Sequence, residues 1–141
     1  MIVLDTNVLS ETLRPQPHVG VIAWLRQAPA NTTLTSISVG EIFTGIRLLP
    51  QGRRREGLMA AAKELLATFG DRVLPYDERA ARIYAKMHES RRRAGEPLSV
   101  EDGMIAAICR THGAVLATRN VKDFHRLGVE LFDPWDPDTA S

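Results

Sequence analysis

The chain has 141 residues and a mass of 15.6 kDa, the size of one ordinary domain with its own core. A net charge of +1 gives no overall field to attract a polyanion, so any contact with nucleic acid must come from local basic patches. One cysteine excludes an internal disulfide, no apolar run reaches membrane-spanning length, and Asp5 and Glu11 interrupt the opening stretch where a signal peptide would be apolar. We expect one cytoplasmic domain over residues 1–135, with a short polar tail over 136–141 and no membrane contact.

The predicted elements are short strands and helices that alternate along the chain. Short apolar or β-branched runs predict strands at residues 2–4, 33–37, 73–74 and 114–117, with 130–132 as a fifth strand at an edge. Apolar residues at helical spacing predict helices at 7–13, 19–25, 39–46, 54–69, after Asp77, and from Ser99 to about His112, where Gly113 ends the helix. The alternation indicates a doubly wound α/β fold, with a parallel central sheet of four to five strands flanked by helices.

Four acidic residues occur where a strand gives way to a helix or loop: Asp5, Glu41, Asp102 and Asp123. The carboxyl ends of parallel strands meet at one edge of a sheet, so we expect these side chains to lie together there. Carboxylates that are brought together repel one another, and such a cluster usually holds a cation. Oxygen ligands suit Mg²⁺ or Mn²⁺, so the pattern favours a metal-dependent hydrolase.

Each acid taken alone also has a structural explanation. Ser38-x-x-Glu41 and Ser99-x-x-Asp102 both match a capping box, in which the acid reaches back to the start of its helix. Asp5 is equally suited to be an N-cap, and Asp123 to begin a turn over 123–127. The joint placement of all four favours the metal site. We also expect the positive helix N-termini to keep Glu41 and Asp102 ionised at neutral pH.

Other chemistries are disfavoured. The four histidines show no paired ligand spacing and Cys109 has no partner cysteine, which argues against zinc. No Gly-x-Ser-x-Gly elbow or glycine-rich phosphate loop is present. Arginine supplies 15 of the 18 basic residues, with runs at 53–55 and 91–93. These runs suit either phosphate contacts or solvated helix faces, and the sequence leaves both open.

Five segments together resemble one known family: Ile2-Val-Leu-Asp5-Thr6-Asn7, Ile37-Ser-Val-Gly-Glu41-Ile42, Glu101-Asp102-Gly-Met-Ile-Ala-Ala107, Ala117-Thr-Arg-Asn120-Val-Lys-Asp123-Phe124 and Asp133-Pro-Trp135. In this order and spacing they resemble the PIN-domain ribonucleases, most closely the VapC and FitB-like toxins of bacterial toxin–antitoxin pairs. The resemblance runs nearly end to end and implies a PIN-like fold.

The resemblance also implies roles for individual residues. Asp5, Glu41, Asp102 and Asp123 would be both the metal-binding and the catalytic acids, and Thr6, Thr118 and Asn120 would be the polar residues beside them. Many relatives carry an acid where Asn120 stands, which leaves open whether one or two metal ions bind.

The implied activity is Mg²⁺- or Mn²⁺-dependent endoribonuclease cleavage of RNA, leaving 5′-phosphate and 3′-hydroxyl ends. The implied partners are a second copy in a homodimer and a cognate antitoxin with a DNA-binding N-terminal domain, joined in a larger hetero-oligomer. Two alternatives remain. One is a catalytically inactive PIN-fold module that binds RNA. The other is a phosphatase that forms an aspartyl-phosphate on Asp5, although such enzymes want a second aspartate where this chain has Asn7.

Overall fold

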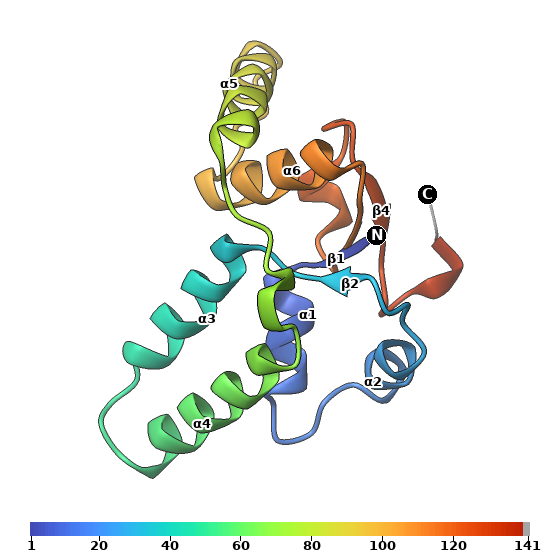
Figure 1. Cartoon of the computed structure of the whole chain (residues 1–141). Helices are drawn as coiled ribbons and strands as arrows, with labels where there is room; N and C mark the ends of the chain where they lie inside the picture. The colour runs from blue at the N-terminus through green and yellow to red at the C-terminus, as the bar shows by residue number, and fades with distance from the viewer. Residues whose placement is uncertain (140–141) are drawn as a thin grey trace.

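A parallel sheet of four short strands lies at the centre of the molecule (Figure 1). Its strands are β1 (Ile2–Leu4), β2 (Thr32–Thr33), β3 (Val115–Ala117) and β4 (Glu130–Phe132), in the order β2-β1-β3-β4. The structure is a computed structural model that describes residues 1–139, so positions 140–141 of the predicted tail lie outside the described residues. The predicted parallel sheet, with 130–132 at its edge, is confirmed.

The helices form two layers, one on each face of the sheet (Figure 1). Over residues 1–139 they are α1 (Thr6–Thr12), α2 (Val19–Arg26), α3 (Ser36–Arg47), α4 (Arg53–Ala67), α5 (Glu78–Arg93) and α6 (Val100–His112). Successive side chains of a strand point to opposite faces. Val3 therefore packs in the core with α5 and α6, and Leu4 packs in the core with α1 to α4. Within the described residues, no helix combines the length and apolarity needed to cross a bilayer.

Two predicted strands are wrong in part. Of the segment 33–37, only Thr33 lies in a strand, and Thr35 adds a single isolated bridge. Helix α3 begins at Ser36 because the Thr35 hydroxyl accepts a hydrogen bond from the Ser38 backbone N–H at 3.2 Å. The capping hydroxyl outweighs the β-propensity of this threonine-rich stretch. Residues 73–74 contribute one parallel bridge, from Leu74 to Thr35, and no strand. Pro75 follows at once and has no N–H to extend the ladder.

The predicted start of α5 and the predicted start and end of α6, the two helices that pack with Val3, are confirmed. Asp77 caps α5 through the backbone N–H of Ala80, and Ser99 caps α6. Gly113 follows α6 in the left-handed conformation, with φ of 59°. This turn returns the chain directly to β3, beside β1. The end of β1, the end of β3 and the start of α6 are thereby fixed relative to one another.

Candidate acidic site

Asp5 lies at the centre of the acidic site, at the carboxyl end of β1. Its backbone N–H donates to Ala117 O at 2.9 Å, which extends the β1–β3 pairing and brings Thr118 beside it. Its side chain is only 4% exposed and accepts hydrogen bonds from the Thr118 hydroxyl (2.8 Å) and the Thr6 backbone N–H (2.9 Å). The expected N-cap role is therefore real, but it occupies only one of the two carboxylate oxygens.

Burial raises the pKa of Asp5 to about 6. The hydrogen bonds from Thr118 and Thr6 oppose this rise, and the charges of Asp102 and Glu41 add to it. These two acids therefore lie near enough to Asp5 to repel it. Three of the four predicted acids share one electrostatic neighbourhood.

Glu41 reaches this neighbourhood from the second turn of α3, and not from the start of the helix. The predicted capping box on Ser38 is wrong, because Thr35 is the N-cap. The Glu41 carboxylate instead accepts a hydrogen bond from the Thr6 hydroxyl at 2.7 Å, and Thr6 lies 2.8 Å from the Ser38 hydroxyl. Because the Thr6 proton goes to Glu41, Ser38 donates to Thr6. Capping therefore does not explain Glu41.

Asp102 stands in the first turn of α6, where Ser99 is the N-cap as predicted. The Ser99 hydroxyl accepts from the Asp102 backbone N–H at 3.2 Å. Burial raises the pKa of the Asp102 carboxyl, the Ser99 hydroxyl lowers it, and the charges of Asp123 and Glu101 raise it further. The net shift of the Asp102 pKa is upward, with burial as its largest cause, and the expectation that the helix terminus keeps Asp102 ionised at neutral pH stays a prediction.

Asp123 is the outermost of the four acids. It lies in the short 3-10 helix η2 (Val121–Phe124), and its side chain is exposed. The predicted turn over 123–127 is thus only partly right, because the 3-10 helix begins two residues before Asp123 and ends at Phe124. The charge of Asp123 acts on Asp102, however, which places Asp123 on the outer side of the cluster, next to α6.

The polar neighbours divide into those that touch the acids and one that does not. Thr6 and Thr118 bind acids through their hydroxyls, as described above. Asn120 contributes its backbone N–H, which donates to the Thr118 hydroxyl at 3.0 Å, and its side chain is exposed. Sequence reasoning missed Asn7, whose amide lies 3.4 Å from both Asp5 Oδ2 and Thr118 Oγ1. Its position two residues after Asp5, in the first turn of a helix, was the available signal.

The donor set fits a hard divalent cation in its chemistry. Carboxylates and hydroxyls converge around a buried Asp5 whose raised pKa comes partly from its acidic neighbours, and a cation would relieve that repulsion. Within residues 1–139, no three acidic, histidine or cysteine side chains form an assembled metal-binding group. The acids are neighbours without a preformed coordination shell.

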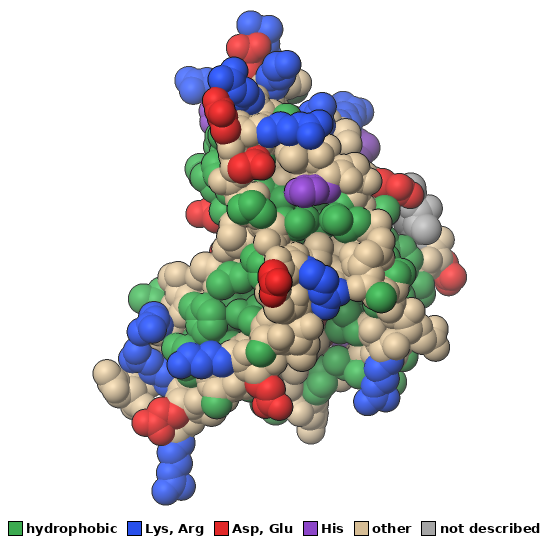
Figure 2. Space-filling view, viewed as in Figure 1, with side chains coloured by type: hydrophobic (Ala, Val, Ile, Leu, Met, Phe, Trp, Pro, Cys, Tyr) green, Lys and Arg blue, Asp and Glu red, His purple; other side chains and the backbone are tan. Residues whose placement is uncertain are grey.

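Basic side chains are distributed unevenly over the surface. Figure 2 shows Lys and Arg side chains gathered at the outer end of α5 and along the arm formed by α3 and α4. Arg92 and Arg93 are exposed, but Arg91 of the same run is buried, so neither a phosphate contact nor a solvated helix face applies to it. Closer to the acids, the exposed Arg119 lies over the ring of Trp135, 5.1 Å from its centroid.

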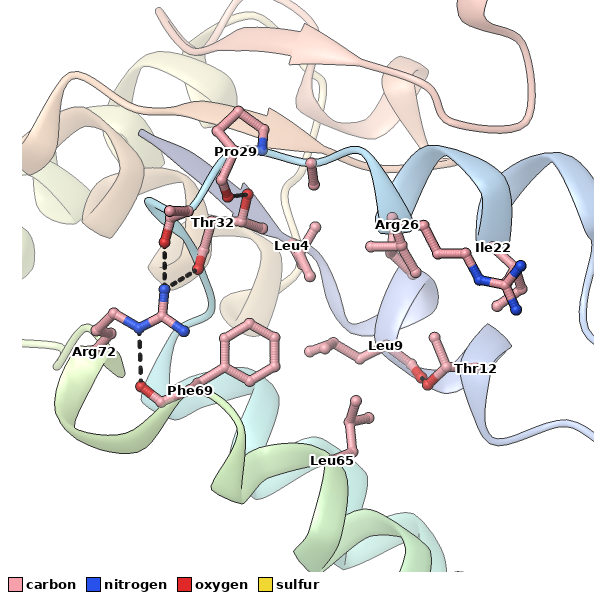
Figure 3. A pocket seen from close by; sticks show the side chains of 14 residues that line it. Leu4, Leu9, Thr12, Ile22, Arg26, Pro29, Thr32, Leu65, Phe69 and Arg72 are labelled. Carbon is pink, nitrogen blue, oxygen red and sulfur yellow. Dashed lines mark hydrogen bonds between the residues drawn. The ribbon is translucent and has the colours of Figure 1, made fainter.

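Two apolar cavities lie beside α1. The first, of about 400 Å³, is bounded by α1, α2 and α4 (Figure 3). Leu9, Leu65 and Phe69 converge on it, with Arg72 at one end. The second, of about 370 Å³, lies between α1, α3 and α4, and its lining includes Glu41, Ile42 and Ile46. Glu41 therefore belongs both to the lining of the second cavity and to the acidic site.

Comparison with known proteins places this arrangement in a family. A family model described as the PIN domain matches residues 2–130. Toxin FitB of Neisseria gonorrhoeae is 39% identical over 137 residues, which cover 96% of this chain and 99% of that protein. VapC ribonuclease Y4jK of Sinorhizobium fredii is 37% identical over 139 residues, with 97% of this chain and 99% of that protein covered.

Solved structures agree with the fold. The FitAcB crystal structure from Neisseria gonorrhoeae superposes with a TM-score of 0.89 at 39% identity and covers 96% of this chain and 99% of the other. DNA-bound VapBC from Salmonella typhimurium gives a TM-score of 0.82 at 25% identity, with 94% and 97% covered.

Proposed function

This chain belongs to the PIN-domain family, and from that premise we propose that it is a Mg²⁺- or Mn²⁺-dependent endoribonuclease acting as the toxin of a toxin–antitoxin pair. The observation that carries the proposal is the buried carboxylate of Asp5, with Glu41 and Asp102 close enough to repel it. A fold gains no stability from such a group, and sites of this kind are retained for chemistry.

The residues have distinct proposed roles. Asp5, Glu41, Asp102 and Asp123 would hold the cation through their carboxylates, with Asp5 innermost. When bound, the cation supplies charge neutralisation at the scissile phosphate and makes a water molecule more acidic. The hydroxyls of Thr6 and Thr118 keep the Glu41 and Asp5 carboxylates oriented. Asp102 or Glu41 positions the attacking water.

The test is RNA cleavage by the purified chain with Mg²⁺, with Mn²⁺ and with EDTA. We expect EDTA to abolish cleavage, and Asp5→Asn, Glu41→Gln, Asp102→Asn and Asp123→Asn each to lower the rate at least about a hundredfold, because each removes a carboxylate that would hold the cation whose charge stabilises the reacting phosphate. Expression of the wild-type chain should arrest growth, and these variants should relieve the arrest.

Glu64→Gln is the matched control, since it removes an exposed acid of α4 away from the site and should leave cleavage unchanged. Undiminished cleavage in EDTA or in Asp5→Asn would overturn the metal site. RNA binding without cleavage by the wild type would favour the inactive module. Rapid hydrolysis of p-nitrophenyl phosphate would favour the phosphatase.

A cognate antitoxin is the proposed partner, supported by similarity to chains from the FitAB and VapBC complexes. We expect its N-terminal domain to bind DNA and its C-terminal segment to follow the groove beside the acids. A basic side chain of that segment would compete with the cation. Apolar residues next to it would pack near 19–25 and 42–46, where Ile22 and Leu25 line the first cavity and Ile42 and Ile46 the second.

The basic residue is tested in the co-purified complex. Changing it to alanine should restore cleavage while the two chains remain associated. Inhibition that survives this change would show that the antitoxin acts by covering the RNA path instead.

A further inference from the structure

Arg91 is a buried cation with no acidic partner among residues 1–139. It lies in the last turn of α5 and is only 9% exposed. Its guanidinium donates to three backbone carbonyls: Nε to Glu96 O at 3.0 Å, Nη1 to His125 O at 2.7 Å and Nη2 to Asp123 O at 3.1 Å. The ion pairs found within residues 1–139 involve Arg14, Arg82 and Arg93, and none involves Arg91.

Burying this charge among carbonyls is costly compared with burying an apolar side chain of similar size. An apolar side chain would pack there but would leave the three carbonyls without their donor. The role of the buried charge therefore lies in the chain segments that carry the three carbonyls. Two segments far apart in the chain meet at this one side chain.

The first segment is the loop between α5 and α6. Two hydrogen bonds join Glu96 to Arg91: the Glu96 carbonyl accepts from the guanidinium, and the Glu96 backbone N–H donates to Arg91 O at 2.9 Å. The loop continues into Ser99, the N-cap whose hydroxyl holds the first turn of α6 and with it Asp102. Arg91 therefore anchors the approach to Asp102.

The second segment is the turn that carries Asp123. Arg91 holds this turn at the carbonyls of residues 123 and 125. The next residue, Arg126, has φ of 63°, a left-handed conformation that is unfavourable for a residue with a side chain. The guanidinium fork is thus bound directly before a strained position, which it helps to keep in place.

We propose that Arg91 is a positioning residue that sets the separation of Asp102 and Asp123, and through it the affinity of the outer half of the acidic site for a divalent cation. This inference rests on the proposed metal-dependent function. Arg91 touches neither carboxylate, and it acts through the backbone that presents both. Lysine cannot replace it, because an ammonium group is a single point donor and cannot span three separate acceptors in the geometry of a planar fork.

The experiment compares Arg91→Lys with the wild type by calorimetric titration of Mn²⁺ in the absence of RNA. We expect Mn²⁺ affinity to fall roughly tenfold, as when a residue that orients metal ligands is lost. The Mn²⁺ concentration for half-maximal RNA cleavage should rise by the same factor. The rate at saturating Mn²⁺ should return to within about threefold of the wild type, a recovery that general loss of structure would not produce.

Arg82→Lys is the matched control, because it makes the same change on an exposed residue of α5 and should leave Mn²⁺ affinity unchanged. A folded Arg91→Lys chain with wild-type Mn²⁺ affinity would overturn the inference and leave the proposed function standing. A wild type that binds no Mn²⁺ would overturn both.

If Arg91→Lys alone does not fold, the titration is repeated on Arg91→Lys combined with Arg126→Gly. Glycine removes the backbone strain at the turn and should recover stability without restoring the fork. Arg126→Gly alone is the reference for that pair. Equal Mn²⁺ affinity in the two chains would again overturn the role of Arg91.

Discussion

Asp5 illustrates at the scale of one residue how the proposed function opposes stability. Its carboxyl has a pKa of about 6 in the folded chain, against an ordinary value of 3.8. The folded state therefore holds this proton more tightly than the unfolded state, and its stability falls as pH rises through this interval. Without metal, Asp5→Asn should raise the free energy of unfolding at pH 8 by roughly 1–3 kcal/mol, because the amide carries no charge to bury. Thermal unfolding in EDTA measures this gain.

The same variant has two internal controls. The gain should disappear well below pH 3.8, where the wild-type carboxyl is protonated in both states. Added Mn²⁺ should raise the melting temperature of the wild type and not that of Asp5→Asn, since binding to the folded state alone is stabilising. A variant less stable than the wild type at pH 8 in EDTA would contradict this account of Asp5.

At the scale of the element, the contact between α5 and α6 depends on a residue without a side chain. A Cβ added at Gly103 would lie 2.6 Å from Tyr84 Cε2 and 3.1 Å from Leu98 Cδ2. Gly103→Ala should therefore force the helices apart and lower the free energy of unfolding by roughly 1–3 kcal/mol. Because Asp102 is the preceding residue, RNA cleavage should fall as well. Chemical denaturation and a cleavage assay measure the two effects.

Gly57→Ala provides the comparison within a helix. A Cβ at Gly57 of α4 meets nothing within 4 Å, so alanine there should stabilise the chain by about 0.5–1 kcal/mol through its better helix propensity. If both alanine variants changed stability in the same direction, the close approach at Gly103 would not be the cause.

The elements could largely be predicted from the sequence, because apolar spacing and caps such as Asp77, Ser99 and Gly113 are local signals. The resemblance to PIN-domain ribonucleases, drawn from motif order, is confirmed by the full-length similarity. The start of α3 was misplaced because Thr35 satisfies both a strand pattern and a cap, and in the folded chain it does both: its backbone forms a bridge to Leu74 while its hydroxyl caps α3. Nothing local in a run of three arginines distinguishes the buried Arg91 from its exposed neighbours, since its three acceptors are carbonyls of a loop and a distant turn.

At the scale of the whole molecule, we predict a homodimer. Val100 is an apolar side chain that is 49% exposed at the start of α6, and a net charge of +1 opposes association only weakly. Val100 stands two residues before Asp102, so a dimer formed there would bring two acidic sites to one RNA path. Light scattering at micromolar concentration should give twice the chain mass.

Val100→Glu should shift this mass toward that of the monomer, because it places a charge in the apolar contact. Val19→Glu makes the same change on α2, away from the acids, and should leave the dimer intact. A wild-type chain that scatters as a monomer would end the dimer hypothesis. A dimer that persists in Val100→Glu would show that the interface does not include Val100.

The strand order has a consequence for how the protein is made. β1 is made before β2, β3 and β4, yet it lies inside the sheet and pairs with β3, which follows α1 to α6. A nascent chain that has emerged only through α6 already contains Asp5, Glu41 and Asp102, but it lacks the Ala117 carbonyl and the Thr118 hydroxyl that hold Asp5. Domains fold as units once their chain is available. The proposed acidic site is therefore assembled only after β3 and Thr118 have been made, so no site with Asp5 held in place exists while the chain reaches only α6.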